Sequence, residues 1–168
     1  AKYGKQVVAW EEIGQVDLLP GVLVQRWNMD PAHTAHTLQA VAQGARVIMS
    51  PANRTYLDMK YTADTPLGLQ WAGLIEVRDA YDWDPGTYLA GVDEADIAGI
   101  EAPIWAETLR TIDEVLAMAF PRLPGIAELG WSPAAGRAWA EYRTRLAAHA
   151  PGWEAHGIRY HRSPQVDW

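Results

Sequence analysis

The sequence predicts an α/β fold built on a parallel sheet, because short apolar strands alternate with helices along the chain. Four strand-like runs lie at Gln6–Trp10, Val22–Trp27, Arg46–Ser50 and Ile97–Trp105. They are rich in β-branched residues and nearly continuous in apolar character, as is typical of strands buried on both faces of a parallel sheet. The length of 168 residues is enough for one domain of ordinary size.

The first predicted helix lies between the second and third runs. Asp30 is placed to cap its first turn, Pro31 occupies the first helical position, and Gly44 follows its last turn. A strand, a helix and a further strand in this order form a βαβ unit. The stretch Pro51–Asp96 is longer than structureless loops normally are, so we expect functional loops and short helices within it.

Two further helices are predicted after the fourth run. The first of them starts at a capping box formed by Thr111 and Glu114 and ends near Phe120. Two prolines just beyond its end are expected to interrupt the helical pattern. A last helix is expected between Ser132 and Pro151.

Charge and composition exclude several classes of partner. Lys and Arg number 14 against 21 Asp and Glu, and the net charge of -7 without a basic cluster argues against nucleic acid and anionic membranes. The longest apolar stretch, Val115–Phe120, is too short to span a bilayer. The absence of cysteine excludes disulfides, thiolate metal sites and cysteine nucleophiles. The first residues lack the apolar segment of a secretion signal, and they resemble the interior of a domain rather than its start. The sequence does not indicate the compartment.

Nine tryptophans beside a single phenylalanine are the most unusual feature of the composition. Flat, amphipathic indole rings suit a ligand such as a sugar ring, and packing in the core is the alternative. Trp10, Trp27 and Trp105 each lie at the end of a strand-like run, with carboxylates nearby. Ligands of parallel α/β folds bind outside the carboxyl ends of the strands. This placement favours a sugar pocket over a plug at the end of the sheet.

Ten short motifs, taken in order, resemble the C-terminal half of the catalytic domain of family 20 glycoside hydrolases, the β-N-acetylhexosaminidases. The motifs are Val8–Ile13, Gln25–Trp27, Val47–Pro51, Tyr56–Asp58, Gln70–Gly73, Tyr81–Pro85, Gly99–Ala102, Ile104–Glu107, Phe120–Leu123 and Ala127–Ser132. The resemblance implies that residues 1–168 are the C-terminal portion of a (β/α)8 TIM barrel. Residues 1–132 would form strands five to eight with their helices, and residues 133–168 a closing helix and tail.

The resemblance implies an activity and a pocket wall of tryptophans. Members of the family hydrolyse terminal β-linked N-acetylhexosamine residues, and the substrate's own acetamido oxygen is the nucleophile. Trp10, Trp27 and Trp105 would enclose the acetamido methyl group and one face of the sugar. Trp71 would lie near the mouth of the pocket.

The resemblance also implies roles for three polar residues. Tyr56 would be the catalytic residue whose hydroxyl holds the acetamido carbonyl oxygen, as a neutral phenol can. Asp58 and Glu107 would accept hydrogen bonds from sugar hydroxyls, because carboxylates offer only acceptors. The residue types alone leave other roles open: a loop tyrosine bonded to the backbone, and carboxylates that cap a helix or pair with arginine.

The acid/base pair of the family has no counterpart in this sequence. The resemblance places an adjacent Asp-Glu pair at the end of a fourth strand, which would precede Ala1. Asp93-Glu94 lies instead in a polar loop before the last strand, and Asp113-Glu114 belongs to the capping box. We therefore expect the chain alone to be inactive and to require the upstream half of the barrel or a second copy. The alternative is a non-catalytic carbohydrate-binding or assembly module.

The expected substrate is a glycan that ends in N-acetylhexosamine, or a chitooligosaccharide. No cofactor and no metal are expected. His33 and His36 lie three residues apart on the first helix, but the sequence shows no third ligand near them. We therefore expect both imidazoles to be solvated.

Overall fold

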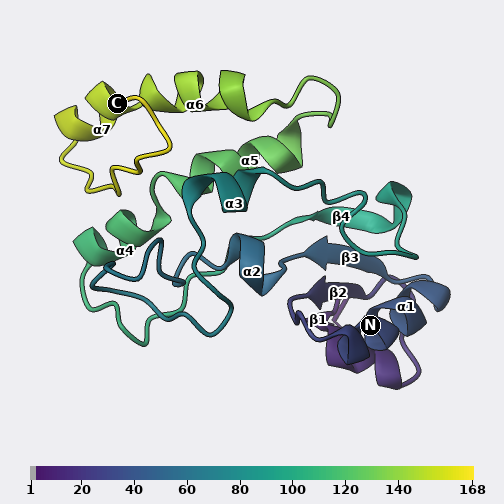
Figure 1. Cartoon of the computed structure of the whole chain (residues 1–168). Coiled ribbons are helices and arrows are strands. Elements are labelled where there is room, and N and C mark those ends of the chain that lie inside the picture. The colour runs from purple at the N-terminus through teal and green to yellow at the C-terminus, as the bar shows by residue number, and fades with distance from the viewer. Residues whose placement is uncertain (1–2) are drawn as a thin grey trace. The chain divides into compact units, whose positions relative to one another are not determined.

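The computed structural model describes residues 3–168, and Ala1 and Lys2 lie outside the described residues (Figure 1). The chain divides into two compact units. The first comprises the chain up to Ala52 together with Asp84–Glu101, and the second comprises Asn53–Trp83 together with Ala102–Trp168. Each unit gathers segments that are distant in the sequence.

The first unit carries a four-stranded parallel sheet in the order β1-β2-β3-β4, as predicted (Figure 1). Its strands are β1 (Val8–Trp10), β2 (Leu23–Arg26), β3 (Arg46–Met49) and β4 (Ile97–Ile100). The fourth strand is shorter than its apolar run, since it ends at Ile100. Pro103 has no N–H to donate to a strand ladder, which explains why the strand does not continue.

The helices of the first unit are η1 (Glu11–Gln15), α1 (Pro31–Ala42) and η2 (Glu94–Asp96). The predicted start of α1 is confirmed, because Asp30 Oδ1 accepts the N–H of Ala32 at 2.9 Å. Gly44, beyond its end, has a φ of 84°, which favours glycine. A core cluster lies between α1 and the sheet and consists of Val22, Val24, Ala40 and Ala45, with Ile13 and Leu18 packed against it.

The short helix η1 lies directly against α1. A Cβ atom on Gly14 would come within 2.0 Å of the carbonyl oxygen of His36, so only glycine permits this approach. Trp10 ends β1, and η1 starts at the next residue. The contact at Gly14 therefore fixes the segment that follows Trp10.

The helices of the second unit are α3 (Val77–Tyr81), α4 (Ile112–Ala119), α5 (Arg122–Trp131), α6 (Trp139–Ala147) and α7 (Ala150–Ala155), and the short α2 (Ala52–Thr55) lies at its boundary in the sequence. Thr111 Oγ1 accepts the N–H of Glu114 at 3.3 Å, and Glu114 Oε2 accepts the N–H of Thr111 at 3.0 Å. The predicted capping box of α4 is thus confirmed. The expected short helices within Pro51–Asp96 are also present, as α2, α3 and η2.

Prolines caused two errors in the predicted helices. Helix α5 starts at Arg122 and contains Pro124 in its first turn, where the missing N–H needs no partner within the helix. The last predicted helix corresponds to α6, which starts only after Gly136, whose φ is 96°. Helix α7, which contains Pro151 in its first turn, was not predicted. Proline at the start of a helix was therefore misread as its end.

The core of the second unit is built from aromatic and aliphatic side chains of all its segments. Tyr81 and Tyr142 stack with ring centroids 4.0 Å apart. The fully buried side chains include Tyr61, Met59, Ile75, Val77, Met118 and Leu146, and also the charged Arg122. Among the residues described, no helix has the length and apolar character to cross a membrane.

Candidate functional site

Trp10 and Trp27 lie at the carboxyl ends of adjacent parallel strands in the first unit. Trp10 is the last residue of β1, and Trp27 directly follows β2. Their ring centroids are 6.3 Å apart at an interplanar angle of 76°. Trp10 is 37% exposed, so one indole remains open to solvent. The two rings form an apolar corner at the end of the sheet where ligands of parallel folds bind.

A buried glutamate fixes this corner. Glu11 is fully buried, and it accepts hydrogen bonds from Arg26 Nη1 and from the N–H of Trp27, both at 2.6 Å. Burial raises the pKa of Glu11, and the Trp27 N–H and the Arg26 charge oppose that rise. Glu12 Oε1 accepts the indole N–H of Trp27 at 3.1 Å. Glu11 is one of the carboxylates that follow the strand ends in the sequence, and in the structure it holds Trp27 in position.

The expectation that His33 and His36 are solvated is wrong. Both side chains are half-buried, and their ring centroids lie 5.0 Å apart. His33 Nδ1 lies 3.8 Å from Glu11 Oε1 and 3.6 Å from Glu12 Oε1, so carboxylates from η1 supply the neighbours that the sequence did not show. Glu11 already pairs with Arg26, so the carboxylate beside His33 belongs to an ion pair next to Trp27.

Tyr56, Trp71 and Trp105 meet in the second unit. The centroid of the Tyr56 ring is 5.8 Å from that of Trp71, at 88°, and 6.5 Å from that of Trp105, at 45°. Tyr56 is buried, while Trp71 and Trp105 are 51% and 43% exposed. A buried phenol between two accessible indoles can bind a ligand with both a polar atom and an apolar face.

Asp58 is the most unusual residue of this cluster. Its side chain is 1% exposed, and neither carboxylate oxygen has a hydrogen-bond partner in the described part of the chain. Burial raises the pKa of Asp58, and the nearby charge of Glu107 adds to the rise. The N–H groups of Asp58 and Trp105 favour the charged form, but neither makes a hydrogen bond of normal geometry. Glu107 itself is exposed.

Backbone hydrogen bonds tie together the segments that carry these side chains. The N–H of Leu57 donates to Pro103 O at 2.8 Å, which joins the Tyr56–Asp58 segment to the segment of Trp105. The N–H of Leu69 donates to Asp58 O at 2.9 Å, and that of Lys60 donates to Leu69 O at 2.7 Å. The site is therefore positioned by main-chain contacts as well as by side-chain packing.

Gly68 allows two of these segments to approach closely. Its φ is 92°, and an added Cβ atom would lie 2.6 Å from Asp58 O and 3.2 Å from the Lys60 nitrogen. The N–H of Gly68 donates to Thr108 Oγ1 at 2.8 Å, next to Glu107 in the sequence. Sequence reasoning missed both Gly68 and Thr108, because their roles depend on contacts between distant segments.

Arg122 is a further residue that sequence reasoning did not assign to the site. Its guanidinium donates to Leu57 O at 2.6 Å and to Met59 O at 2.8 Å, the carbonyls on either side of Asp58. The available signal was the resemblance of Phe120–Leu123 to a family motif, which includes this arginine.

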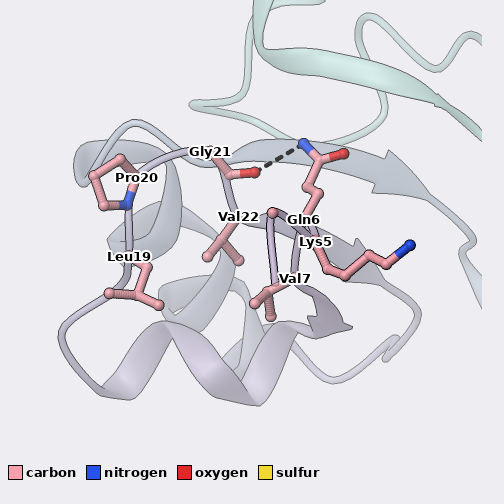
Figure 2. A pocket seen from close by; sticks show the side chains of 8 residues that line it. Lys5, Gln6, Val7, Leu19, Pro20, Gly21 and Val22 are labelled. Atoms are coloured by element: carbon pink, nitrogen blue, oxygen red, sulfur yellow. Dashed lines mark hydrogen bonds between the residues drawn. The ribbon is translucent and has the colours of Figure 1, made fainter. Parts of the chain in front are cut away.

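A hollow of about 450 Å³ lies at the amino ends of β1 and β2 (Figure 2). Trp10 and Trp27 lie at the carboxyl ends of these strands. Residues Gly4–Val7, which precede β1, and Leu19–Val22, which precede β2, line it. Gln6 Nε2 donates to Gly21 O at 2.8 Å across it. Because parallel sheets bind ligands at the carboxyl ends of their strands, this hollow is not the candidate sugar site.

Comparisons with known proteins point to one family. The sequence model for "Glycosyl hydrolase family 20, catalytic domain" matches residues 1–134. A β-N-acetylhexosaminidase of Cellulomonas fimi is 50% identical over 167 residues, which cover 98% of this chain and 33% of the relative.

Solved structures show the same similarity. The GH20 β-N-acetylhexosaminidase of Streptomyces coelicolor A3(2) matches with a TM-score of 0.96 and 55% identity, over 99% of this chain and 34% of that chain. A mutant Streptomyces plicatus β-hexosaminidase, solved with the product GlcNAc, matches with the same TM-score of 0.96. The chain spans about a third of the length of these relatives.

Proposed function

Because the chain belongs to glycosyl hydrolase family 20, we propose that it supplies substrate-binding residues to a β-N-acetylhexosaminidase. Its four parallel strands with their helices are part of the (β/α)8 barrel of that family. The proposed reaction is the hydrolysis of terminal β-linked N-acetylglucosamine or N-acetylgalactosamine residues. The substrate is a glycan or a chitooligosaccharide that ends in such a sugar.

The observation that carries this proposal is the state of Asp58. A buried carboxylate without a partner is costly, so a native protein retains one mainly where a ligand completes it. Asp58 caps no helix and, among the described residues, makes no ion pair with arginine, so the structural alternatives for it do not apply. Sugar hydroxyls are the donors that would satisfy both oxygens of Asp58, with Glu107 accepting from a further hydroxyl.

Tyr56 is assigned the central chemical step. In substrate-assisted retaining catalysis the acetamido carbonyl oxygen attacks the anomeric carbon and forms an oxazolinium-type intermediate, which water then opens. The Tyr56 hydroxyl would donate a hydrogen bond to that oxygen and hold it on the line of attack. Burial of Tyr56 between Trp71 and Trp105 supports the assignment, since a fixed donor loses little order when the substrate binds.

The tryptophans are assigned the apolar parts of the sugar. Trp10, Trp27 and Trp105 would enclose the acetamido methyl group and one sugar face, and Trp71 would lie near the pocket mouth. The network of Glu11, Arg26 and Glu12 around Trp27 supports this role, because a pocket wall must keep its shape without the ligand.

We propose further that this chain alone does not catalyse the reaction. Glu114 is engaged in the capping box of α4, and Asp93 and Asp96 form a corresponding box at η2. Neither Asp-Glu dipeptide is therefore available as the acid/base pair, which we assign to the upstream half of the barrel. That half, or a second copy, would also cover the exposed edge at β1, where Val8 is 53% exposed.

A pair of matched substrates tests the proposed function. The complete protein that carries this chain should hydrolyse a chromogenic N-acetyl-β-glucosaminide and leave the corresponding β-glucoside, which lacks the acetamido group, essentially untouched. Equal rates on both substrates would refute substrate-assisted catalysis. Binding of N-acetylglucosamine without any turnover would identify a carbohydrate-binding module instead.

A further inference from the structure

Arg122 differs from an ordinary surface arginine in its burial, its contact with an aromatic ring and its lack of an ion pair. It is 1% exposed, and its guanidinium carbon lies 3.8 Å from the centroid of the Tyr61 ring. In the described residues it makes no ion pair with a carboxylate in direct contact. A buried cation of this kind needs a compensating charge, because its desolvation is costly.

The hydrogen bonds of Arg122 converge on the backbone around Asp58. Nη2 donates to Leu57 O at 2.6 Å and Nη1 donates to Met59 O at 2.8 Å, so the two carbonyls that flank Asp58 are both held. Further bonds to Ile75 O at 3.1 Å and to Met118 O at 2.8 Å anchor the guanidinium to neighbouring segments. The planar guanidinium of arginine has enough N–H groups for these four carbonyl oxygens, whereas a lysine ammonium offers three donors at most.

The charges around Asp58 oppose one another. Glu107, from the segment that follows β4, disfavours the ionised form of Asp58, and Arg122, at the start of α5, favours it. Burial raises the pKa of Asp58 most strongly, the N–H groups of Asp58 and Trp105 oppose that rise, and the charge of Arg122 opposes it more weakly. A sugar-binding carboxylate accepts hydroxyl donors best when it is ionised.

We propose that Arg122 is a positioning residue for Asp58: its guanidinium holds the two carbonyls beside Asp58, and its positive charge favours the ionised form of this buried carboxylate. Arg122 does not touch the substrate in this scheme. The inference rests on the proposed function of Asp58 as an acceptor for sugar hydroxyls. It goes further in naming the group that sets the position and the charge of that acceptor.

Two substitutions separate the charge of Arg122 from its geometry. Arg122→Met removes both, so the acid limb of kcat/KM against pH should move upward in the complete enzyme. Arg122→Lys keeps the charge and loses the guanidinium hydrogen bonds to both carbonyls. The acid limb should therefore stay in place while kcat/KM falls. Tyr61→Phe is the matched control, because it removes the hydrogen bonds to Met118 O and Phe120 O without changing any charge.

The outcomes distinguish this inference from the proposed function. If the parent does not hydrolyse the chromogenic N-acetylglucosaminide, the proposed function fails. If the parent is active and folded Arg122→Met keeps the parental acid limb, or Tyr61→Phe shifts it equally, the role of Arg122 is refuted.

A measurement on the unmodified protein keeps the inference testable if Arg122→Met does not fold. The carboxyl carbon of Asp58, assigned with Asp58→Asn, should show an ionised group at pH 7 in a ¹³C NMR titration. A carboxyl group that is neutral at pH 7 would overturn the proposal.

Discussion

The hydroxyl of Tyr56 is expected to act while the acetamido oxygen attacks, rather than while the substrate rests in the pocket. Tyr56→Phe in the complete enzyme should therefore lower kcat by far more than it weakens binding of N-acetylglucosamine. Loss of such a donor raises the barrier by about 2.7 to 4 kcal/mol, against about 0.5 to 1.5 kcal/mol for an ordinary hydrogen bond. Steady-state kinetics and calorimetric binding measure the two quantities, and equal kcat in mutant and parent would refute the role.

Loss of the Asp58 carboxylate should stabilise the folded protein and weaken binding of the sugar. Because burial raises its pKa in the folded state, the ionised carboxylate opposes folding at neutral pH, and this cost vanishes below the ordinary pKa of 3.8. Asp58→Asn should therefore raise the melting temperature at pH 7 and give no such gain near pH 3.5.

The same substitution should weaken binding of N-acetylglucosamine by about 1.5 to 3 kcal/mol, because a charged acceptor is lost. Thermal unfolding at the two pH values and calorimetry check both effects. A mutant that is less stable at pH 7 and binds the sugar as well as the parent would show that Asp58 is a structural group.

A local motif suggests single site residues, whereas contacts with remote partners cannot be read from the sequence. Tyr56 and Asp58 lie in one short motif, and the structure places Tyr56 with Trp71 and Trp105 as an aromatic cluster. Arg122 bonds to Leu57, which is 65 residues away, so no pattern along the chain could reveal the contact. The unpartnered state of Asp58 likewise follows from burial, which a sequence does not state.

At the level of elements, the loop that carries Trp71 is expected to depend on Gly68. Gly68→Ala would place a methyl group 2.6 Å from Asp58 O, in addition to the strain of a positive φ, which costs of order 1 to 3 kcal/mol. Gly73→Ala is the matched control, since Gly73 also has a positive φ, of 103°, but nothing lies within 4 Å of its added Cβ.

We expect Gly68→Ala to reduce kcat/KM for the N-acetylglucosaminide much more than Gly73→Ala does, with both variants folded by circular dichroism. The contact with the Asp58 backbone is the difference between them. Similar losses in the two variants would show that backbone strain alone matters and that the approach to Asp58 does not.

Elements whose signals are local were predicted well. The caps of α1 and α4 depend on side chains within four residues, and both were confirmed. Helix α5 was missed because Pro124 lies in its first turn, a position that only the helix start makes acceptable. Helix α7 was missed for the same reason, since Pro151 lies in its first turn.

At the scale of the whole molecule, the isolated 168-residue chain is expected to be inactive and not to behave as a lone monomer. General acid catalysis is usually worth roughly 10²- to 10⁴-fold, and we assign its residues to the upstream half. The edge at β1 leaves apolar side chains exposed, and unpaired strand edges associate.

Light scattering on the isolated chain checks the predicted association, and the chromogenic assay checks the predicted inactivity. A well-behaved monomer of 18.6 kDa would contradict the argument from the sheet edge. Turnover by this chain alone would contradict the assignment of the acid/base pair to the upstream half.

The central claim is that this chain binds the N-acetylhexosamine through the Tyr56–Asp58 segment. A crystal structure of the complete protein with N-acetylglucosamine tests it most directly. We predict that both oxygens of Asp58 lie within hydrogen-bond distance of sugar hydroxyls and that the Tyr56 hydroxyl contacts the acetamido oxygen. A sugar bound elsewhere, for example in the hollow at Lys5–Val7, with Asp58 still unpartnered, would contradict the account.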